Sequence, residues 1–253
     1  MSGNATPTRV VTASGNDIID GILTTTAWDG GFVEYSFPTT NATYSYLTET
    51  DWPANMFGLN ASQQTAVHFA LNADIGPIAA DGFSVEGFTN LTITQDTTPD
   101  SGDTIRIANT TSTTLGTAAV ADFPGNSETF EFDDNGDVWF GPYNGGVYLS
   151  PTAGNFAWHT HLHELGHALG LSHGHSTFQM GVKLPSAYDA MEYSVMTYRS
   201  YVNDPLIGGY SNETWGYAQT YMMADIAALQ YLYGADFTTN SGNTVYKLSL
   251  IHI

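Results

Sequence analysis

The sequence has no cysteine among its 253 residues. Disulfide bonds, thiolate metal sites and cysteine nucleophiles are therefore excluded. Positive charge is also scarce: five Lys and Arg residues stand against 25 Asp and Glu residues, which gives a formal net charge of −20. A surface this negative repels phosphate backbones and anionic lipid, so we expect neither nucleic acid nor a membrane as a partner.

Long apolar runs are missing as well, since no stretch approaches the roughly 18 apolar residues that a bilayer span requires. Residues 1–20 are polar and lack the basic-then-apolar order of a secretory signal peptide, so we interpret them as a flexible leader or short propeptide. Hydrophobic residues make up 42% of the chain and aromatic residues 13%. This content is enough to bury a core and excludes wholesale disorder.

The first half of the chain predicts strands, because β-branched and aromatic residues alternate between Gly, Asp and Asn. The predicted strands cover residues 32–37, 91–95, 103–108 and 136–140, with a weaker one at 118–123. Apolar residues at helical spacing predict a helix over 61–72. His68 lies in that helix, and we interpret it as an ordinary half-buried histidine.

The segment 155–171 has the clearest helical pattern. Trp158, Leu162, Leu165 and Leu169 recur at i, i+4, i+7 and i+11, which predicts one apolar stripe facing a core, and Gly170 follows as a stop signal. A long irregular stretch then precedes a last helix over 221–233. With no internal repeat and no low-complexity linker, these parts predict one domain in two lobes.

The same helix carries the motif His163-Glu164-x-x-His167-x-x-Gly170-x-x-His173. Residues i and i+4 are neighbours on one helix face, so His163 and His167 can share one ion, with the Glu164 carboxylate beside its water. Gly170 permits a sharp turn that brings in His173 as a third ligand. Three neutral nitrogens plus water make an open catalytic zinc site. These letters arise by chance in on the order of one chain in 10⁵, which makes the metal interpretation far stronger than solvated histidines.

Three neighbouring histidines offer alternatives. His159 forms a rival i, i+4 pair with His163, but no glutamate follows it, so we interpret it as helix surface. His161 points to another side and is expected in solvent. His175 competes with His173 but lies two residues beyond the pattern.

A second signal follows downstream, where Met196 and Tyr198 stand in an otherwise irregular segment. The long histidine motif followed by a methionine turn resembles the metzincin zinc endopeptidases. Tyrosine two residues after the methionine resembles the serralysin and astacin branches. The stretches VEYSF, GDVWFG, DIAALQYLYG and TTNSGNTVY are similar to serralysins in particular, so the resemblance covers about residues 30–246.

The resemblance implies an α+β, metzincin-type two-lobed catalytic domain. Its upper lobe, to about residue 173, would hold a twisted, mostly parallel five-stranded sheet and two helices, including the long active-site helix. Its lower lobe, 174–237, would hold the Met-turn and the C-terminal helix. The catalytic domain would thus span 21–237.

The resemblance also implies the site. His163, His167 and His173 would bind zinc, Glu164 would be the base, Tyr198 a further ligand, and Met196 a hydrophobic floor beneath the metal.

The chain departs from serralysins in two places. Gly174 and His175 stand where a proline usually follows the third histidine. The calcium-binding Gly-Gly-x-Gly-x-Asp repeats are missing, and we interpret 238–253 as the truncated start of a C-terminal region. Calcium stays open as a second cofactor without a supporting motif: the run 133–137 resembles a calcium loop, but its glycine is one position early, so a turn is the better interpretation.

The sequence therefore predicts a secreted, monomeric zinc endopeptidase acting on extended polypeptides, which would pair with an edge strand at 118–122. Its export signal would be C-terminal and missing from this chain. Zinc would activate a water and Glu164 would take its proton, while Tyr198 would hydrogen-bond the oxyanion. Alternatives are an inactive zinc-binding or substrate-binding module on the same scaffold, and a calcium-dependent adhesin fragment, which the missing repeats disfavour.

Overall fold

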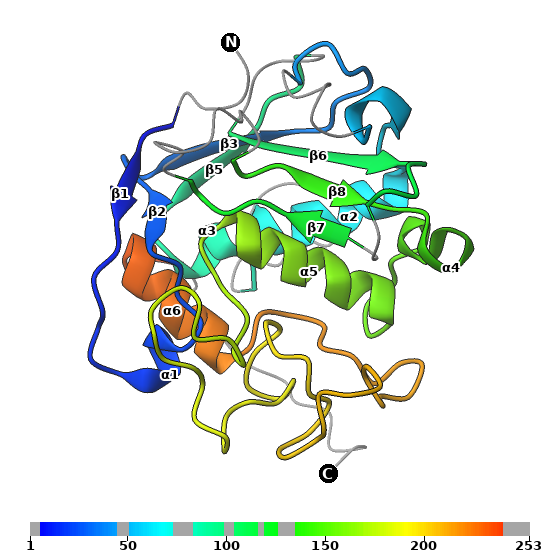
Figure 1. The fold of residues 1–253 in the computed structure, drawn as a ribbon. Helices are drawn as coiled ribbons and strands as arrows, with labels where there is room; N and C mark the ends of the chain where they lie inside the picture. The colour runs from blue at the N-terminus through cyan, green and yellow to red at the C-terminus, as the bar shows by residue number, and fades with distance from the viewer. Residues whose placement is uncertain are drawn as a thin grey trace.

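The computed structural model describes residues 6–44, 51–72, 83–98, 104–115, 119–125 and 135–239 (Figure 1). Its helices and strands, in chain order, are β1 (Thr8–Val10), α1 (Asp17–Asp20), β2 (Thr26–Trp28), β3 (Phe32–Ser36), η1 (Pro53–Asn55), β4 (Met56–Phe57), α2 (Ala61–Leu71), α3 (Val85–Phe88), β5 (Thr92–Gln95), β6 (Ile105–Thr110), β7 (Ala119–Ala121), β8 (Val138–Phe140), α4 (Tyr143–Gly146), η2 (Val147–Leu149), α5 (Phe156–Ala168) and α6 (Met223–Tyr233).

The main sheet has the strand order β5-β3-β6-β8-β7, and the short β4 also pairs with β6. The first three pairings along this order are parallel, and β7 runs antiparallel to β8 at the edge. The predicted mostly parallel five-stranded sheet is confirmed. Parallel strands are usually covered on their faces, which explains why β6 is buried along its whole length.

The two predicted helices of this half, α2 and α5, contact one another and pack below the sheet (Figure 1). Asn60 begins α2 through a capping box with Gln63. His68 is half-buried on α2, as predicted, and its Nε2 lies 3.1 Å from Gln95 Oε1.

Below α5 lies the irregular segment that precedes α6 (yellow to orange in Figure 1). Residues 172–222, all of which the structure describes, contain no helix or strand. The core nevertheless runs through both halves. One buried apolar cluster contains Val33 and Ile107 of the sheet, Leu165 of α5, Met196 of the irregular segment and Leu229 of α6. This continuous packing places α5 at the centre of the molecule.

The N-terminal residues contribute to the fold as well. β1 pairs antiparallel with β2, and the Arg9 guanidinium donates to the carbonyl of Leu232 on α6. The boundary at residue 20 stays a prediction, and most of 238–253 lies outside the described residues.

The acidic run at 133–137 forms a turn where the structure describes it. Gly136 has φ +82° and leads into β8. The buried Asp137 carboxylate forms an ion pair with Arg106 at 2.7 Å. Residues 133 and 134 lie outside the described residues. None of the described helices is long and apolar enough to cross a bilayer.

Candidate metal centre

Helix α5 and the turn after it position three histidines. His163 and His167 lie one turn apart on α5, which begins where the Asn155 side chain accepts the Trp158 N–H at 2.8 Å. The chain then leaves the helix at Gly170 with φ +98°. A Cβ there would have the strain of a left-handed conformation and would lie 3.1 Å from Leu232 Cδ1. This turn returns His173 to the face that carries the other two rings.

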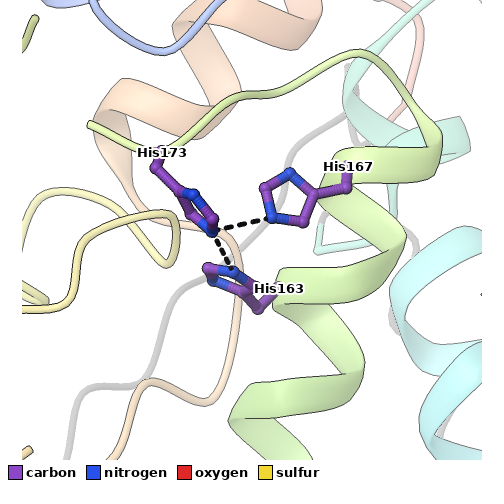
Figure 2. A group of neighbouring side chains, drawn as sticks. All are labelled: His163, His167 and His173. Carbon is purple, nitrogen blue, oxygen red and sulfur yellow. Dashed lines mark hydrogen bonds between the residues drawn. The ribbon is translucent and has the colours of Figure 1, made fainter. Parts of the chain in front are cut away.

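The three imidazoles point toward one another (Figure 2). Nε2 of His173 lies 3.1 Å from Nε2 of His163 and 3.0 Å from Nε2 of His167. One ring nitrogen from each residue lies within 4.8 Å of the other two. The three residues that the motif predicted as a set are therefore brought together.

Backbone carbonyls fix the tautomers of two rings. Nδ1 of His163 donates to Val195 O at 2.7 Å, and Nδ1 of His167 donates to Leu171 O at 2.7 Å. A carbonyl oxygen can only accept, so in each neutral ring Nδ1 carries the hydrogen and Nε2 is a bare lone pair. Such second hydrogen bonds also orient metal-binding histidines.

This arrangement fits a divalent metal ion. Nε2 of His173 carries at most one hydrogen and can donate it to only one of the bare Nε2 atoms of His163 and His167. In at least one of these two contacts, two nitrogen lone pairs therefore face each other and repel. A cation bound by all three nitrogens removes that repulsion. Tetrahedral zinc with Zn–N bonds of about 2.0–2.1 Å sets its nitrogen ligands roughly 3.3 Å apart, close to the separations here.

Burial keeps the three rings neutral, as metal ligands must be. Burial is the largest cause and, together with neighbouring histidines, it lowers the pKa of His163 to about 4 and that of His173 to about 3. Burial also holds the pKa of His167 well below its usual range. The nitrogens are therefore available as lone-pair donors across the neutral range.

Glu164 and Tyr198 lie beside the triad, and with His163 they line one cavity of about 550 Å³. The Glu164 side chain is only 6% exposed. Burial, followed by the charge of Asp122, raises its pKa to about 8. The Tyr198 hydroxyl lies 2.8 Å from Nε2 of His173, and burial raises the pKa of this phenol to about 12. A carboxyl group and a neutral hydroxyl thus stand next to the three imidazoles.

Met196 is fully buried under the same stretch of helix. A Cβ added at Gly166 would lie 2.7 Å from the Met196 sulfur. The glycine inside the histidine motif therefore lets Met196 pack directly against the backbone of α5, between the turns that carry His163 and His167.

Asp225 of α6, for which the sequence pattern makes no prediction, braces this site. Its carboxylate accepts the Val195 N–H at 2.8 Å and the Ser194 hydroxyl at 2.6 Å. Val195 in turn holds His163 through its carbonyl. In the sequence, Asp225 is an acidic residue in the first turn of a predicted helix, which indicates a helix cap. This pattern does not reveal its hydrogen bond with Val195, which lies 30 residues earlier.

The predictions for two neighbouring histidines are wrong. His159 is 1% exposed rather than on a helix surface, and His161 is 0% exposed rather than solvated. The cause is that the sheet covers one side of α5 and the irregular segment covers the other. His161 stacks on Phe140 at 4.0 Å between ring centroids, and His159 contacts Tyr210. His175 does not replace His173 but stacks on it at 5.3 Å.

No protein-family model matches this sequence. The sequence is similar to several known proteins. Serralysin G of Dickeya chrysanthemi is 32% identical over 226 residues, which cover 81% of this chain and 41% of the relative. Serralysin B of the same organism is 34% identical over 62% of this chain and 32% of the relative. Metalloprotease AprA of Pseudomonas entomophila is 42% identical over 40% of this chain and 21% of the relative.

The aligned part of the chain spans less than half the length of these relatives. Alignment over most of the chain agrees with the converging histidines. The chain is a homologue of the serralysin metalloproteases.

Proposed function

We propose that this chain is the catalytic part of a secreted zinc-dependent endopeptidase that hydrolyses extended polypeptides. The observation that carries the proposal is the convergence of three neutral imidazoles through Nε2, one of which, His163, lines a cavity together with the buried carboxyl group of Glu164. His163, His167 and His173 would hold the ion. When bound, zinc supplies a Lewis acid that polarises a peptide carbonyl and makes water more acidic.

The proposed architecture is the two-lobed metzincin type. The catalytic domain would span 21–237 and divide near residue 173, where the irregular segment begins below α5. Residues 1–20 would be a leader or short propeptide, and 238–253 the start of a C-terminal region. The serralysin relatives support only the proposal that further sequence belongs with the catalytic part, since the aligned region covers less than half of their length.

Glu164 would act as general base and then as general acid. A dication at the triad lowers the pKa of a nearby carboxyl, so Glu164 is ionised at neutral pH when the site is loaded. Its carboxylate would take a proton from the attacking water and pass it to the nitrogen of the departing amine. Burial penalises the charged form of this carboxyl group and raises its pKa, which makes the carboxylate a stronger base toward the proton of the water.

Tyr198 would have two roles. Its hydroxyl lies close enough to the triad to serve as a further ligand, and its raised pKa keeps the proton on the oxygen in the free protein. A neutral phenol at this place can donate a hydrogen bond to the oxyanion that forms at the substrate carbonyl.

The substrate would lie extended along β7. This strand is at the end of the sheet order and contacts α5, and Ala119 lines the same cavity as Glu164. Backbone pairing with an edge strand suits peptides of many sequences. The formal charge of −20 opposes nucleic acid and anionic lipid as alternative partners.

A casein-cleavage assay with and without a chelator tests this proposal. Glu164→Gln should keep zinc binding and lose at least 100-fold in cleavage rate, because a carboxamide cannot take the proton. The matched control is Glu34→Gln on β3, which removes the same charge outside the cavity. Cleavage by Glu164→Gln at the wild-type rate would refute the base assignment, and zinc binding without cleavage by the wild type would favour the inactive zinc-binding module.

A further inference from the structure

A second cavity, of about 250 Å³, adjoins the metal centre and is separate from the cavity that Glu164 lines. His175 lines this second cavity, and its ring stacks on the His173 ring with 5.3 Å between centroids. The His175 ring also lies 4.9 Å from the ring of Tyr198. Leu206 lines both cavities, so they adjoin at this residue. The second cavity therefore begins one ring away from a proposed metal ligand.

The two residues at which this chain departs from serralysins after the third histidine, Gly174 and His175, shape this cavity. The Gly174 N–H donates to Met196 O at 3.2 Å, and the Gly174 carbonyl accepts from Leu184 N at 2.8 Å. A Cβ on Gly174 would lie 2.5 Å from Leu184 Cδ1. Glycine therefore lets the lining residue Leu184 pack closely behind the segment that carries His175, and this packing fixes the chain next to Lys183.

Positive charge gathers at this cavity, although the chain as a whole is strongly acidic. Lys183 and Arg199 line it, and they are two of the five Lys and Arg residues in a chain of formal net charge −20. Of the other three, one is buried in an ion pair, one donates to a carbonyl of α6, and one lies outside the described residues. No Lys or Arg lines the larger cavity beside Glu164. Among the described residues, positive charge is therefore concentrated at the second cavity.

The lining also offers hydrogen-bond donors that the protein itself does not use. Asp189 is its one acidic residue, and both carboxylate oxygens are occupied, since one accepts from the Thr197 hydroxyl at 2.5 Å and the other from Arg199 Nε at 2.8 Å. Arg199 thereby offsets the charge of Asp189. Three side chains of the lining that can donate have no hydrogen-bond partner within the described part of the chain: Lys183, Ser186 and Asn203. Unused donors beside a positive charge favour a negatively charged acceptor such as a carboxylate.

Resting on the proposed function, we propose that this second cavity is a substrate subsite in which Lys183, Ser186 and Asn203 bind the carboxylate of an Asp or Glu side chain near the scissile bond. Its volume of about 250 Å³ is below the range of about 300–1,000 Å³ that is typical of small-molecule sites, and it suits a single side chain. The acidic surface elsewhere repels such a side chain, so selection for it arises at this cavity. A free anion offers the same chemistry, and the experiments below separate the two.

Quenched-fluorescence peptides test this inference. Each peptide carries a single Glu, placed in turn at every position on both sides of the scissile bond, and is compared with the peptide that has Gln there. At one position the wild type should cleave the Glu peptide with a kcat/KM about fivefold above that of the Gln peptide, mainly through a lower KM. High salt should reduce this preference, because ions screen an exposed ammonium group. A wild type that prefers Glu at no position would overturn the inference.

Substitutions of Lys183 identify the group that selects Glu. Lys183→Met should abolish the preference, Lys183→Arg should retain it, and Lys183→Glu should reverse it. Lys183 is exposed, so these variants should fold. The matched control is Arg9→Gln, which removes one positive charge on β1, outside the cavity lining, and should keep the wild-type preference. An unchanged preference in Lys183→Glu, or an equal loss in Arg9→Gln, would overturn the inference.

Binding separates this inference from the proposed function. Calorimetric titration of the same peptides into the Glu164→Gln protein needs no turnover. If the wild type cleaves no peptide but the Glu164→Gln protein binds one Glu peptide about fivefold more tightly than its Gln counterpart, and Lys183→Met removes this difference, the inference stands and the proposed function fails. Equal binding within every pair would overturn the inference by itself.

Inorganic phosphate is the probe for a free anion at the same cavity. Its titration into the Glu164→Gln protein should show weaker binding than that of the preferred Glu peptide. If phosphate instead binds more tightly than every Glu peptide, and Lys183→Met abolishes that binding, the cavity is a free-anion site and the substrate subsite is refuted.

Discussion

The sheet half of this molecule and the irregular half below α5 are held together in different ways. In the sheet half, β3, β6 and β8 form a parallel ladder whose apolar side chains are buried. Residues 172–222 have no such ladder and rely on buried polar groups, among them Asp189 and Asp204. Both halves contribute apolar side chains to one core, but the second half, which has no strand ladder, depends more on specific side-chain hydrogen bonds.

This difference matters because both halves contribute to the triad. His163 and His167 come from α5, whereas His173 and the Val195 carbonyl come from the irregular half. The positions of the ligands thus depend on the polar network, in which Asp225 holds both Ser194 and Val195.

Metal removal should give the largest effect. An ion bound by all three histidines ties α5 to the irregular half, and at 1,000 times its Kd it stabilises the fold by about 4 kcal/mol. We expect a chelator to speed amide hydrogen exchange in residues 172–222 while β6 and β8 stay protected. Uniform loss of protection across both halves would contradict the comparison.

Asp225→Ala should destabilise the irregular half next most strongly. It removes the acceptor of the Ser194 hydroxyl and of the Val195 and Met222 N–H groups. Buried donors left without partners cost about 3 kcal/mol or more together, measurable by urea unfolding. The exposed Asp29→Ala is the control and should cost under about 0.5 kcal/mol. Equal midpoints for the two variants would show that Asp225 does not brace this half.

The pH dependence of stability isolates the same carboxyl group. Burial raises the pKa of Asp225 to about 6 in the folded protein, above its value in the unfolded chain. The folded state therefore binds more protons between pH 4 and 6, so the stability due to this group is present below pH 4 and is lost as pH rises through 6. The loss should be on the order of 3 kcal/mol.

Asp225→Asn is the comparison for this measurement, because its amide can still accept from Val195 and donate to the Ser194 hydroxyl. The wild type should lose stability relative to this variant as pH rises from 4 to 6 and run parallel to it above pH 6.5. Parallel curves over the whole range would contradict the raised pKa.

Ile107→Val in β6 should have the smallest effect. It removes one buried methylene from the sheet half, at about 1 kcal/mol of unfolding free energy. Zinc affinity, measured by competition with a chelating dye, should not change, because Ile107 belongs to the half that packs apolar side chains. A clear fall in the zinc affinity of Ile107→Val would show that packing in the sheet half also sets the positions of the metal ligands.

Local pattern predicted the sheet half and the triad well. The strands follow from alternation within a few residues, and His163, His167 and Gly170 follow from helix spacing and a turn. These features need only short stretches of chain. The convergence of the histidines, which the motif spacing predicted, and the mostly parallel sheet, which the resemblance to metzincins implied, are both confirmed.

Contacts across the irregular half could not be predicted in the same way. His159 looked like surface because nothing near it in sequence shows that Tyr210, 51 residues later, covers it. The link from Asp225 through Val195 to His163 joins three elements with no shared periodicity. Such polar networks depend on tertiary packing, which no local pattern encodes.

Anomalous scattering at the zinc edge, from crystals of the zinc-loaded protein, tests the central claim most directly. We predict one anomalous peak about 2.0–2.1 Å from Nε2 of His163, His167 and His173. A zinc-loaded crystal with no peak at the triad, or with an ion that contacts fewer than these three rings, would contradict the account.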